Sequence, residues 1–276
     1  TGARHYHLAA DDANNAFLVA FLTVPQDSTG VAHILEHTSL CGSQHFPVRD
    51  PFFMMLRRSL STFMNAFTSS DWTAYPFATQ SPKDFDNLLQ VYLDAAFFPK
   101  LEEMDFLQEG HRVEPARPDD PDSELVFKGV VFNEMKGAMS TPVSRLWQLL
   151  QEHLYPTTTY HYNSGGEPER IPDLTYEQLK AFHRLHYHPT NAVFMTYGDL
   201  PAEGHQARFH DLALRHFEPL DMDLSVPDEQ RYDEPRRVEG FYPLEGETDT
   251  SRRTHVVLGW LLGNTVELLS DANGRG

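Results

Sequence analysis

The alternation of apolar and polar residues in the first third of the chain predicts both strands and helices. Residues 17–24 (FLVAFLTV) form an apolar run after the turn-forming DDANN, so the chain should begin with two strands of an antiparallel hairpin. Residues 31–40 favour a helix that is preceded by cap candidates and ends at Gly42. A second short helix should start at the proline of PFFMMLRRSL, residues 51–60. Apolar segments on both sides of a polar SSD turn predict another hairpin over 63–79.

Beyond residue 80 the pattern is mainly helical. Proline and aspartate in PARPDDPDS, residues 115–123, predict an exposed loop. This order of elements predicts an α+β fold, in which an antiparallel sheet packs against helices. Helices are predicted over 82–97, 102–109, 125–139, 175–187 and 203–216, and a strand over 192–197.

The last sixty residues change in character. Residues 218–250 are acidic and contain prolines, which is typical of a linker, and the apolar THVVLGWLLG that follows suits a strand. The sequence therefore predicts a first domain at 1–217, a linker at 218–250 and the first strand of a second domain at 251–276. On this interpretation the chain is the beginning of a longer protein.

Composition narrows the range of partners. The chain has 22 Lys and Arg against 40 Asp and Glu, a formal net charge of -18, which repels nucleic acids and anionic membrane surfaces and favours cationic partners. No apolar stretch approaches the roughly 18 to 20 residues of a membrane span. Cys41 is the single cysteine, which excludes an internal disulfide and fits a reducing compartment.

The main chemical signal is the pentapeptide HILEH, which contains His33, Glu36 and His37. Residues three and four apart project from one helix face, so both imidazoles can reach one metal ion. Imidazole and carboxylate ligands suit zinc, and a catalytic zinc keeps one position open for water. Apolar neighbours such as Ile34 and Leu35 indicate a buried helix, where polar groups need a metal or hydrogen bonds. The alternative is two solvated histidines on a surface helix.

A third ligand should be a carboxylate from another element. Glu134 is the best candidate, because it lies in the apolar segment LVFKGVVFNEMKG. Glu124, Glu109 and Glu114 are rivals, although they lie beside loops or in more polar surroundings, where a solvated carboxylate is the default. Spacing alone leaves the choice open.

Two other groups of possible ligands carry weaker signals. His183, His186 and His188 run from a helix end into a proline turn, so a second metal site there is disfavoured. Cys41 follows His37 by four residues and could approach the metal, but a small buried thiol is the more frequent outcome.

These residues resemble the pitrilysin and insulinase family of zinc peptidases, which pairs an inverted HxxEH motif with a distant glutamate. Three longer segments are similar to the presequence protease branch of that family: GVAHILEHTSLCGSQHFPVRDPF, STFMNAFTSSDWTAYPFAT and LVFKGVVFNEMKGAMS. The resemblance covers nearly the whole chain. It implies a pitrilysin-like catalytic domain with one zinc ion, held by His33, His37 and Glu134, and with Glu36 as general base.

The resemblance also assigns a substrate site to Asn65 and Ala66. In the family this strand is a sheet edge to which the peptide adds as an extra strand; otherwise Asn65 would be interpreted as a turn residue of a hairpin. One position departs from the family, since many relatives have another glutamate seven residues before the metal-binding one, where this chain has Phe127. The role of that carboxylate cannot be transferred, and Glu124 is at best a substitute.

The resemblance implies a zinc metalloendopeptidase that cleaves short unfolded peptides, including basic targeting presequences. The rest of such a multi-domain polypeptide would close around the substrate, so the isolated chain should be poorly active. No nucleic acid or membrane partner is expected, and either a bacterial cytoplasm or an organelle matrix fits. Two alternatives remain: a peptidase that processes precursors at one site, or a catalytically silent family member that serves as a structural or peptide-binding subunit.

Overall fold

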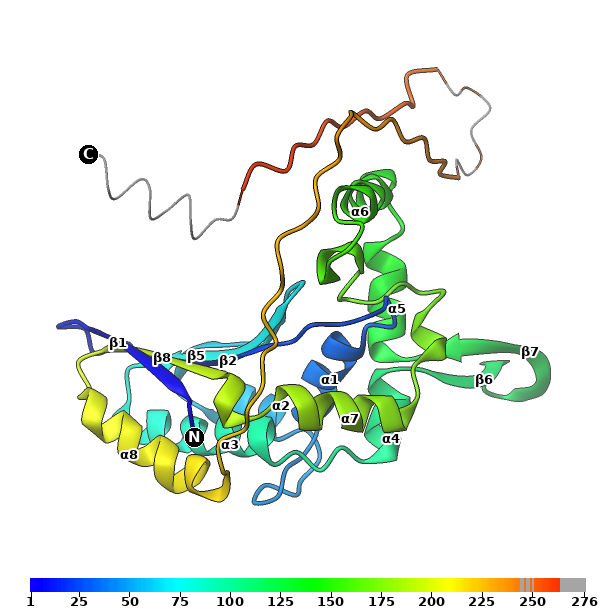
Figure 1. Ribbon diagram of the computed structural model, residues 1–276. Helices are drawn as coiled ribbons and strands as arrows, with labels where there is room; N and C mark the ends of the chain where they lie inside the picture. The colour runs from blue at the N-terminus through cyan, green and yellow to red at the C-terminus, as the bar shows by residue number, and fades with distance from the viewer. Residues whose placement is uncertain (244–245, 247–248, 250, 264–276) are drawn as a thin grey trace.

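A six-stranded sheet, antiparallel apart from one pair, forms the centre of the protein (Figure 1). The computed structural model describes residues 1–243, 246, 249 and 251–263. The edge strand β1 is parallel to its neighbour β8, and all other pairs in this sheet are antiparallel. The order across the sheet is β1 (Arg4–Ala9), β8 (Ala192–Gly198), β2 (Asn15–Leu22), β5 (Trp72–Thr79) and β3 (Ser61–Met64), and β4 (Phe67–Thr68) also pairs with β5.

The predicted N-terminal hairpin is wrong, although both of its strands form. Strand β8 lies between β1 and β2, so Leu18 of β2 faces Met195 of β8 on one side and Pro76 of β5 on the other. The turn before β2 is attached to the end of β8: the Asn15 side chain donates to Asp199 Oδ1 (2.7 Å) and accepts from the backbone N–H of Leu200 (3.1 Å). An apolar run indicates a buried strand, but it does not indicate which other strands pair with it.

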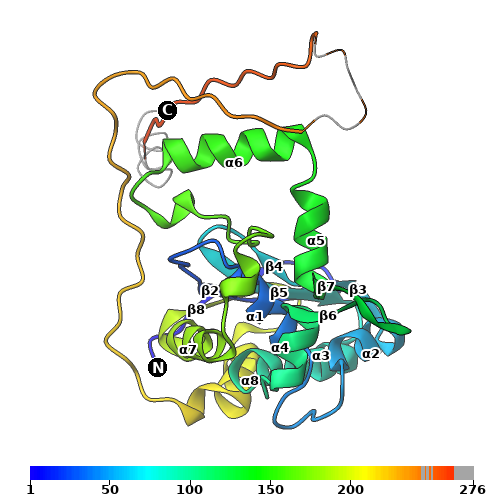
Figure 2. The ribbon, with the colours of Figure 1, turned by 90° about the vertical axis from the view of Figure 1, so that its right-hand side faces the viewer.

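Helices cover one face of the sheet (Figures 1 and 2). Phe17, Val19 and Phe21 alternate along β2 and are at most 1% exposed, as period-two burial requires. The cap candidates ahead of residue 31 form no side-chain cap, since Gly30 occupies the N-cap position. Side-chain caps do mark the starts of two others among the six predicted helices that form near their expected residues: Ser81 accepts from the Asp84 N–H, and Thr175 forms a capping box with Gln178. The six helices are α1 (Val31–Ser39), α2 (Pro51–Arg58), α3 (Pro82–Phe97), α4 (Glu103–Glu109), α7 (Tyr176–His186) and α8 (Ala202–Leu212).

Residues 112–128 form a projecting two-stranded ribbon, which corrects two predictions (Figure 1). The expected loop at 115–123 lies within β6 (Arg112–Arg117) and β7 (Asp120–Lys128), and the expected helix at 125–139 begins only with α5 (Val130–Ala138). Prolines were interpreted as strand breakers, yet they are tolerated in a ribbon with free edges. Glu114 binds both Arg112 and Lys128 and so ties the two strands together.

Helix α6 (Pro142–Leu154) was not predicted, although Thr141 caps it and Pro142 occupies its first turn. Residues 218–243 and 251–263 carry no regular secondary structure and run past α6 (Figure 2). The strand expected in 254–263 does not form. Residues 264–276 lie outside the described residues, so the domain boundaries stay a prediction. Short 3-10 helices complete the chain: η1 (Thr159–His161), η2 (Ile171–Asp173), η3 (Pro189–Asn191) and η4 (Leu214–His216).

Candidate metal centre

Helix α1 holds the HILEH sequence within the core. Ile34 and Leu35 are fully buried, so one face of the helix is fixed against the hydrophobic core and the opposite face can present His33 and His37. The two imidazoles lie one helical turn apart, with ring centroids 5.0 Å from each other and ring planes at 79°. The helix is therefore not a solvated surface helix.

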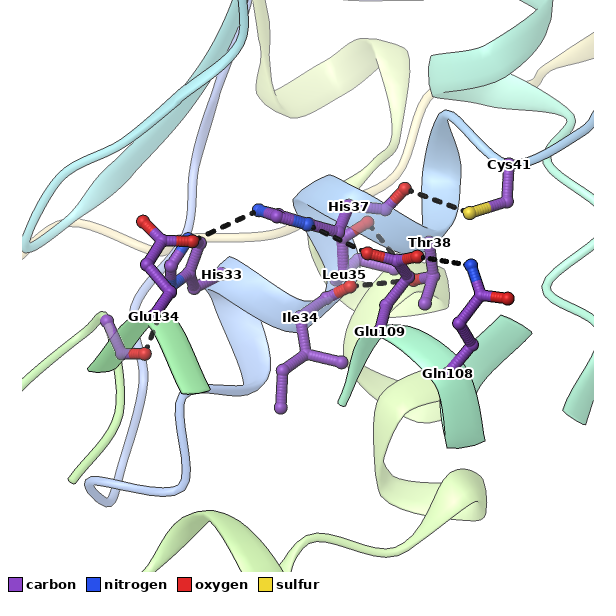
Figure 3. Close-up of polar contacts among 10 residues, drawn as sticks. His33, Ile34, Leu35, His37, Thr38, Cys41, Gln108, Glu109 and Glu134 are labelled. Atoms are coloured by element: carbon purple, nitrogen blue, oxygen red, sulfur yellow. Dashed lines mark hydrogen bonds and ion pairs between the residues drawn. The ribbon is translucent and has the colours of Figure 1, made fainter. Parts of the chain in front are cut away.

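Glu134 of α5 reaches across to both histidines (Figure 3). Its Oε2 atom lies 3.7 Å from His33 Nε2 and 3.8 Å from His37 Nε2. The three ligand atoms lie within 4.8 Å of one another, and in the described part of the chain no other group of three or more His, Cys, Asp or Glu residues satisfies this condition. The structure thus brings together the three residues predicted as ligands.

The remaining ring nitrogens have partners that fix the tautomers. His33 Nδ1 lies 3.1 Å from the Gly165 carbonyl oxygen, and His37 Nδ1 lies 3.0 Å from Glu109 Oε2. A carbonyl and an ionised carboxylate can only accept, so both Nδ1 atoms donate, and Nε2 is the nitrogen of each ring that a metal ion would bind. Two neutral imidazoles and a carboxylate, each imidazole held by a second hydrogen bond, fit the donor set of a catalytic zinc.

Glu109, one of the rival ligands, orients a histidine. Its second carboxylate oxygen accepts from Gln108 Nε2 at 2.9 Å. Burial lowers the pKa of His37, but the hydrogen bond to Glu109 and the charges of nearby carboxylates outweigh it, so this pKa lies above its ordinary value. Burial raises the pKa of Glu109, but the hydrogen bonds from His37 and Gln108 outweigh it and lower this pKa. The pair is an imidazole and a carboxylate that stabilise each other.

The suggestion that Glu124 replaces the missing family glutamate is wrong. Glu124 is exposed on β7, whereas the carboxylate that contacts His37 is Glu109, at the end of α4. The residue seven positions before Glu134 is Phe127, which lies in the ribbon. The ribbon lies between α4 and α5 in sequence, yet these two helices contact each other, so Glu109 is near the site although it is 25 residues before Glu134. Sequence spacing could not detect this.

We expect Glu109→Ala to weaken zinc binding by about 10–100-fold, the usual effect of removing a hydrogen-bond partner of a ligating histidine. Glu109→Gln should lose less, since its amide oxygen can still accept from His37. Competition with a chromophoric chelator measures both constants. Glu103→Ala, which alters an exposed residue of the same helix, is the matched control, and equal affinities for all three variants would refute the role of Glu109.

Glu36 lies beside the three candidate ligands but outside their cluster. It is 8% exposed, and its Oε2 atom accepts a hydrogen bond from Thr68 Oγ1 at 2.7 Å. Thr68 in turn approaches Thr73, which bonds to Thr23 at 2.9 Å. The carboxylate is therefore positioned by strand β4, a contact that nothing in the sequence indicated.

Asn65 and Ala66 lie between β3 and β4, at the edge of the sheet, as the resemblance implied. The Asn65 N–H donates to the Pro76 carbonyl at 3.2 Å, and the Asn65 carbonyl accepts from Tyr92 at 3.4 Å. The Asn65 side chain is on the exposed side. An extended peptide could add along this edge, and its binding there stays a proposal.

The weaker ligand groups do not form a metal cluster. His183 Nε2 bonds to the Ala96 carbonyl, His186 Nδ1 to the Phe182 carbonyl, and His188 Nδ1 accepts from the Thr190 N–H. Burial lowers the pKa of His183 to about 4. Cys41 is buried, with its thiol 3.5 Å from the His37 carbonyl, and burial raises the pKa of this thiol.

No helix in the described residues has the length and apolar character needed to cross a bilayer.

Comparison with known proteins extends the resemblance to the whole chain. Residues 23–134 match the Insulinase (Peptidase family M16) family, and residues 173–272 match the Peptidase M16 inactive domain. The mitochondrial presequence protease of Danio rerio is 61% identical over 273 residues, and that of Xenopus tropicalis 56% identical over 272 residues. Each alignment covers 97% of this chain and 26% of the relative, so the chain spans about a quarter of the length of these relatives.

Solved structures agree on the fold. A protease from Helicobacter pylori superposes with a TM-score of 0.62 at 21% identity, over 83% of this chain and 51% of the other. A variant of the ferredoxin protease FusC, solved with Arabidopsis ferredoxin, gives a TM-score of 0.63 at 18% identity, over 80% of this chain and 24% of the other. These two structures support the fold alone; the family matches and the presequence protease relatives show that the chain belongs to the insulinase family of peptidases, family M16, on the presequence protease branch.

Proposed function

We propose that this chain is the catalytic domain of a zinc metalloendopeptidase and that it binds one zinc ion through His33, His37 and Glu134. The observation that carries the proposal is the approach of Glu134 Oε2 to within 3.8 Å of both histidine Nε2 atoms. Both imidazoles are held by acceptors on their other nitrogens, which leaves the Nε2 lone pairs available.

Hydrolysis would use Glu36 as general base. A bound zinc would lower the pKa of a coordinated water to about 7 and polarise the scissile carbonyl. Glu36 accepts the proton of the attacking water and then passes it to the leaving amine. The Thr68 hydroxyl holds one oxygen of this carboxylate, so the base is kept beside the histidines. No covalent link between enzyme and substrate is required.

We assign substrate binding to the sheet edge at Asn65 and Ala66. Strand β3 is the last strand of the sheet, and its free side can pair with an extended peptide. This mode of binding needs backbone contacts and therefore favours unfolded substrates.

The substrates proposed for the complete protein are short unfolded peptides that carry positive charge. Support comes from the formal charge of -18 and from the name of the relatives, presequence protease. The relatives are about four times as long as this chain, so the proposed enzyme includes further domains of the same polypeptide, beyond the catalytic domain at 1–217 and the linker at 218–250. Because these relatives are mitochondrial, an organelle matrix is the proposed location.

The test compares three peptides of equal length whose central sequence is identical and whose flanks are basic, neutral or acidic. We expect the full-length enzyme to cleave the basic peptide with the highest kcat/KM at low salt, because opposite charge accelerates encounter. The difference should shrink as salt rises, since the Debye length falls to about 8 Å at 0.15 M. A sample stripped of zinc by a chelator should be inactive and should recover with added zinc.

The outcomes separate the alternatives. Equal rates for all three peptides at low salt would reject the charge preference. Cleavage at a single bond only would favour a processing peptidase. Zinc binding without any hydrolysis would identify a silent, peptide-binding member of the family.

A further inference from the structure

A tight turn at residues 163–166 lies between the two helices that carry the candidate metal ligands. Its Gly165 carbonyl accepts from His33 Nδ1 on α1 at 3.1 Å. A Cβ atom added at Gly165 would lie 2.9 Å from the Met135 side chain. Met135 follows Glu134 on α5. One residue of the turn therefore contacts both metal-bearing helices.

Glycines allow this close approach to α1. Gly30, which precedes α1 with a φ of +72°, would carry a Cβ only 2.8 Å from the Gly165 oxygen and 2.9 Å from the Gly166 Cα. Both contacts are with backbone atoms, which cannot move aside like the end of a side chain. Gly166, with a φ of +100°, would carry a Cβ 3.0 Å from the Gly30 Cα and 2.7 Å from the Ile171 side chain. Backbone therefore packs directly on backbone where the carbonyl meets His33.

Hydrogen bonds hold the turn in this place. Asn163 Oδ1 accepts from the Gly165 N–H at 3.1 Å, and the Asn163 carbonyl accepts from the Gly166 N–H at 2.9 Å. Ser28, just before α1, accepts from the Asn163 N–H through its hydroxyl and from the Glu167 N–H through its carbonyl. The turn is thus attached to the segment that leads into the metal-binding helix, although 132 residues separate His33 from Gly165 in sequence.

We propose that residues 163–166 form a positioning element for the metal centre. The Gly165 carbonyl fixes the His33 tautomer that presents Nε2 to the metal, and the absence of a side chain at Gly165 leaves room for the Met135 side chain of α5. The inference rests on the proposed function, since it assumes the ligand set His33, His37 and Glu134. Gly165 acts through His33 and does not touch the substrate.

The experiment uses the full-length protein and measures metal binding without reference to activity. Gly30→Ala should displace the Gly165 carbonyl directly, and Asn163→Ala should release the Gly165 N–H, so each should weaken zinc binding by about 10–100-fold in a chelator competition. Asn163→Asp keeps the acceptor oxygen and should restore most of the affinity. Gly137→Ala is the matched control, because Gly137 lies on α5 three residues after Glu134 with no atom near its would-be Cβ.

Cobalt absorption provides a second readout. The visible bands of the Co²⁺-substituted protein report ligand geometry and should shift in Gly30→Ala and Asn163→Ala but not in Gly137→Ala. Circular dichroism checks that each variant is folded; should Gly30→Ala fail to fold, Asn163→Ala and its Asp rescue decide the question.

The failure of this inference and the failure of the proposed function are distinguishable. Wild-type zinc affinity in folded Asn163→Ala, together with a strong loss in Glu134→Ala, would overturn only the role of the turn. Undiminished zinc binding in Glu134→Ala would overturn the ligand set, and the positioning role with it.

Discussion

Glu36→Gln should abolish nearly all peptide hydrolysis while leaving zinc bound. The amide has the shape of the carboxylate and leaves both imidazoles in place, but it cannot take a proton from water. General base catalysis contributes on the order of 10²–10⁴ in rate, so kcat should fall by about that factor with little change in KM. Turnover of a fluorogenic peptide and zinc content, measured on the same sample, test both parts.

The control for this variant is His37→Ala, which should lose zinc and activity together. A Glu36→Gln enzyme that still turns over within tenfold of the wild type would reject Glu36 as the base. Loss of zinc in Glu36→Gln would instead indicate that Glu36 supports the metal site.

Glu134→Ala should release most of the zinc, because it removes the only ligand contributed by α5. Two histidines from one helical turn remain, and a catalytic zinc normally has three protein ligands. Since Glu134 is 53% exposed in its side chain, the substitution creates no buried cavity, and the fold should survive. Zinc stoichiometry after dialysis and the thermal unfolding midpoint measure the two effects.

Glu124→Ala is the comparison, since Glu124 is an exposed carboxylate on the neighbouring ribbon. It should retain one zinc per chain and full activity. If Glu124→Ala lost zinc and Glu134→Ala kept it, the assignment of the third ligand would be wrong.

Local signals in the sequence were sufficient for most helices and for the HILEH site. Helix α3 begins and ends where its pattern predicted, because Ser81, Pro82 and an apolar stripe all act within one element. The ribbon at 112–128 was missed because its prolines carry the signature of a loop. The neighbours of β1 and β2 were missed because strand pairing depends on residues far away in sequence.

The difference between local and long-range signals also explains which residues of the site the sequence revealed: it indicated the metal ligands but not their hydrogen-bond partners. His33 and His37 are one helical turn apart and can be found by counting, and Glu134 stood out by its apolar surroundings. Glu109, Thr68 and Gly165 come from three other elements, and each is marked by nothing but its position in the folded chain. A hydrogen-bond partner for a ligand is chosen by geometry, so a single sequence does not reveal it.

The insertion of β8 between β1 and β2 has a consequence for the order of events on the ribosome. Strands β2 and β5 can pair early, but the other edge of β2 stays open until residues 192–198 have been made. At typical rates of about 5–20 residues per second, the delay between the end of β5 and the end of β8 is roughly 6–24 s. During it, β1 has no partner and an apolar strand edge is exposed to other chains. The nascent chain therefore passes through a state with an open sheet edge, and β1, although made first, is among the last strands of the sheet to be placed.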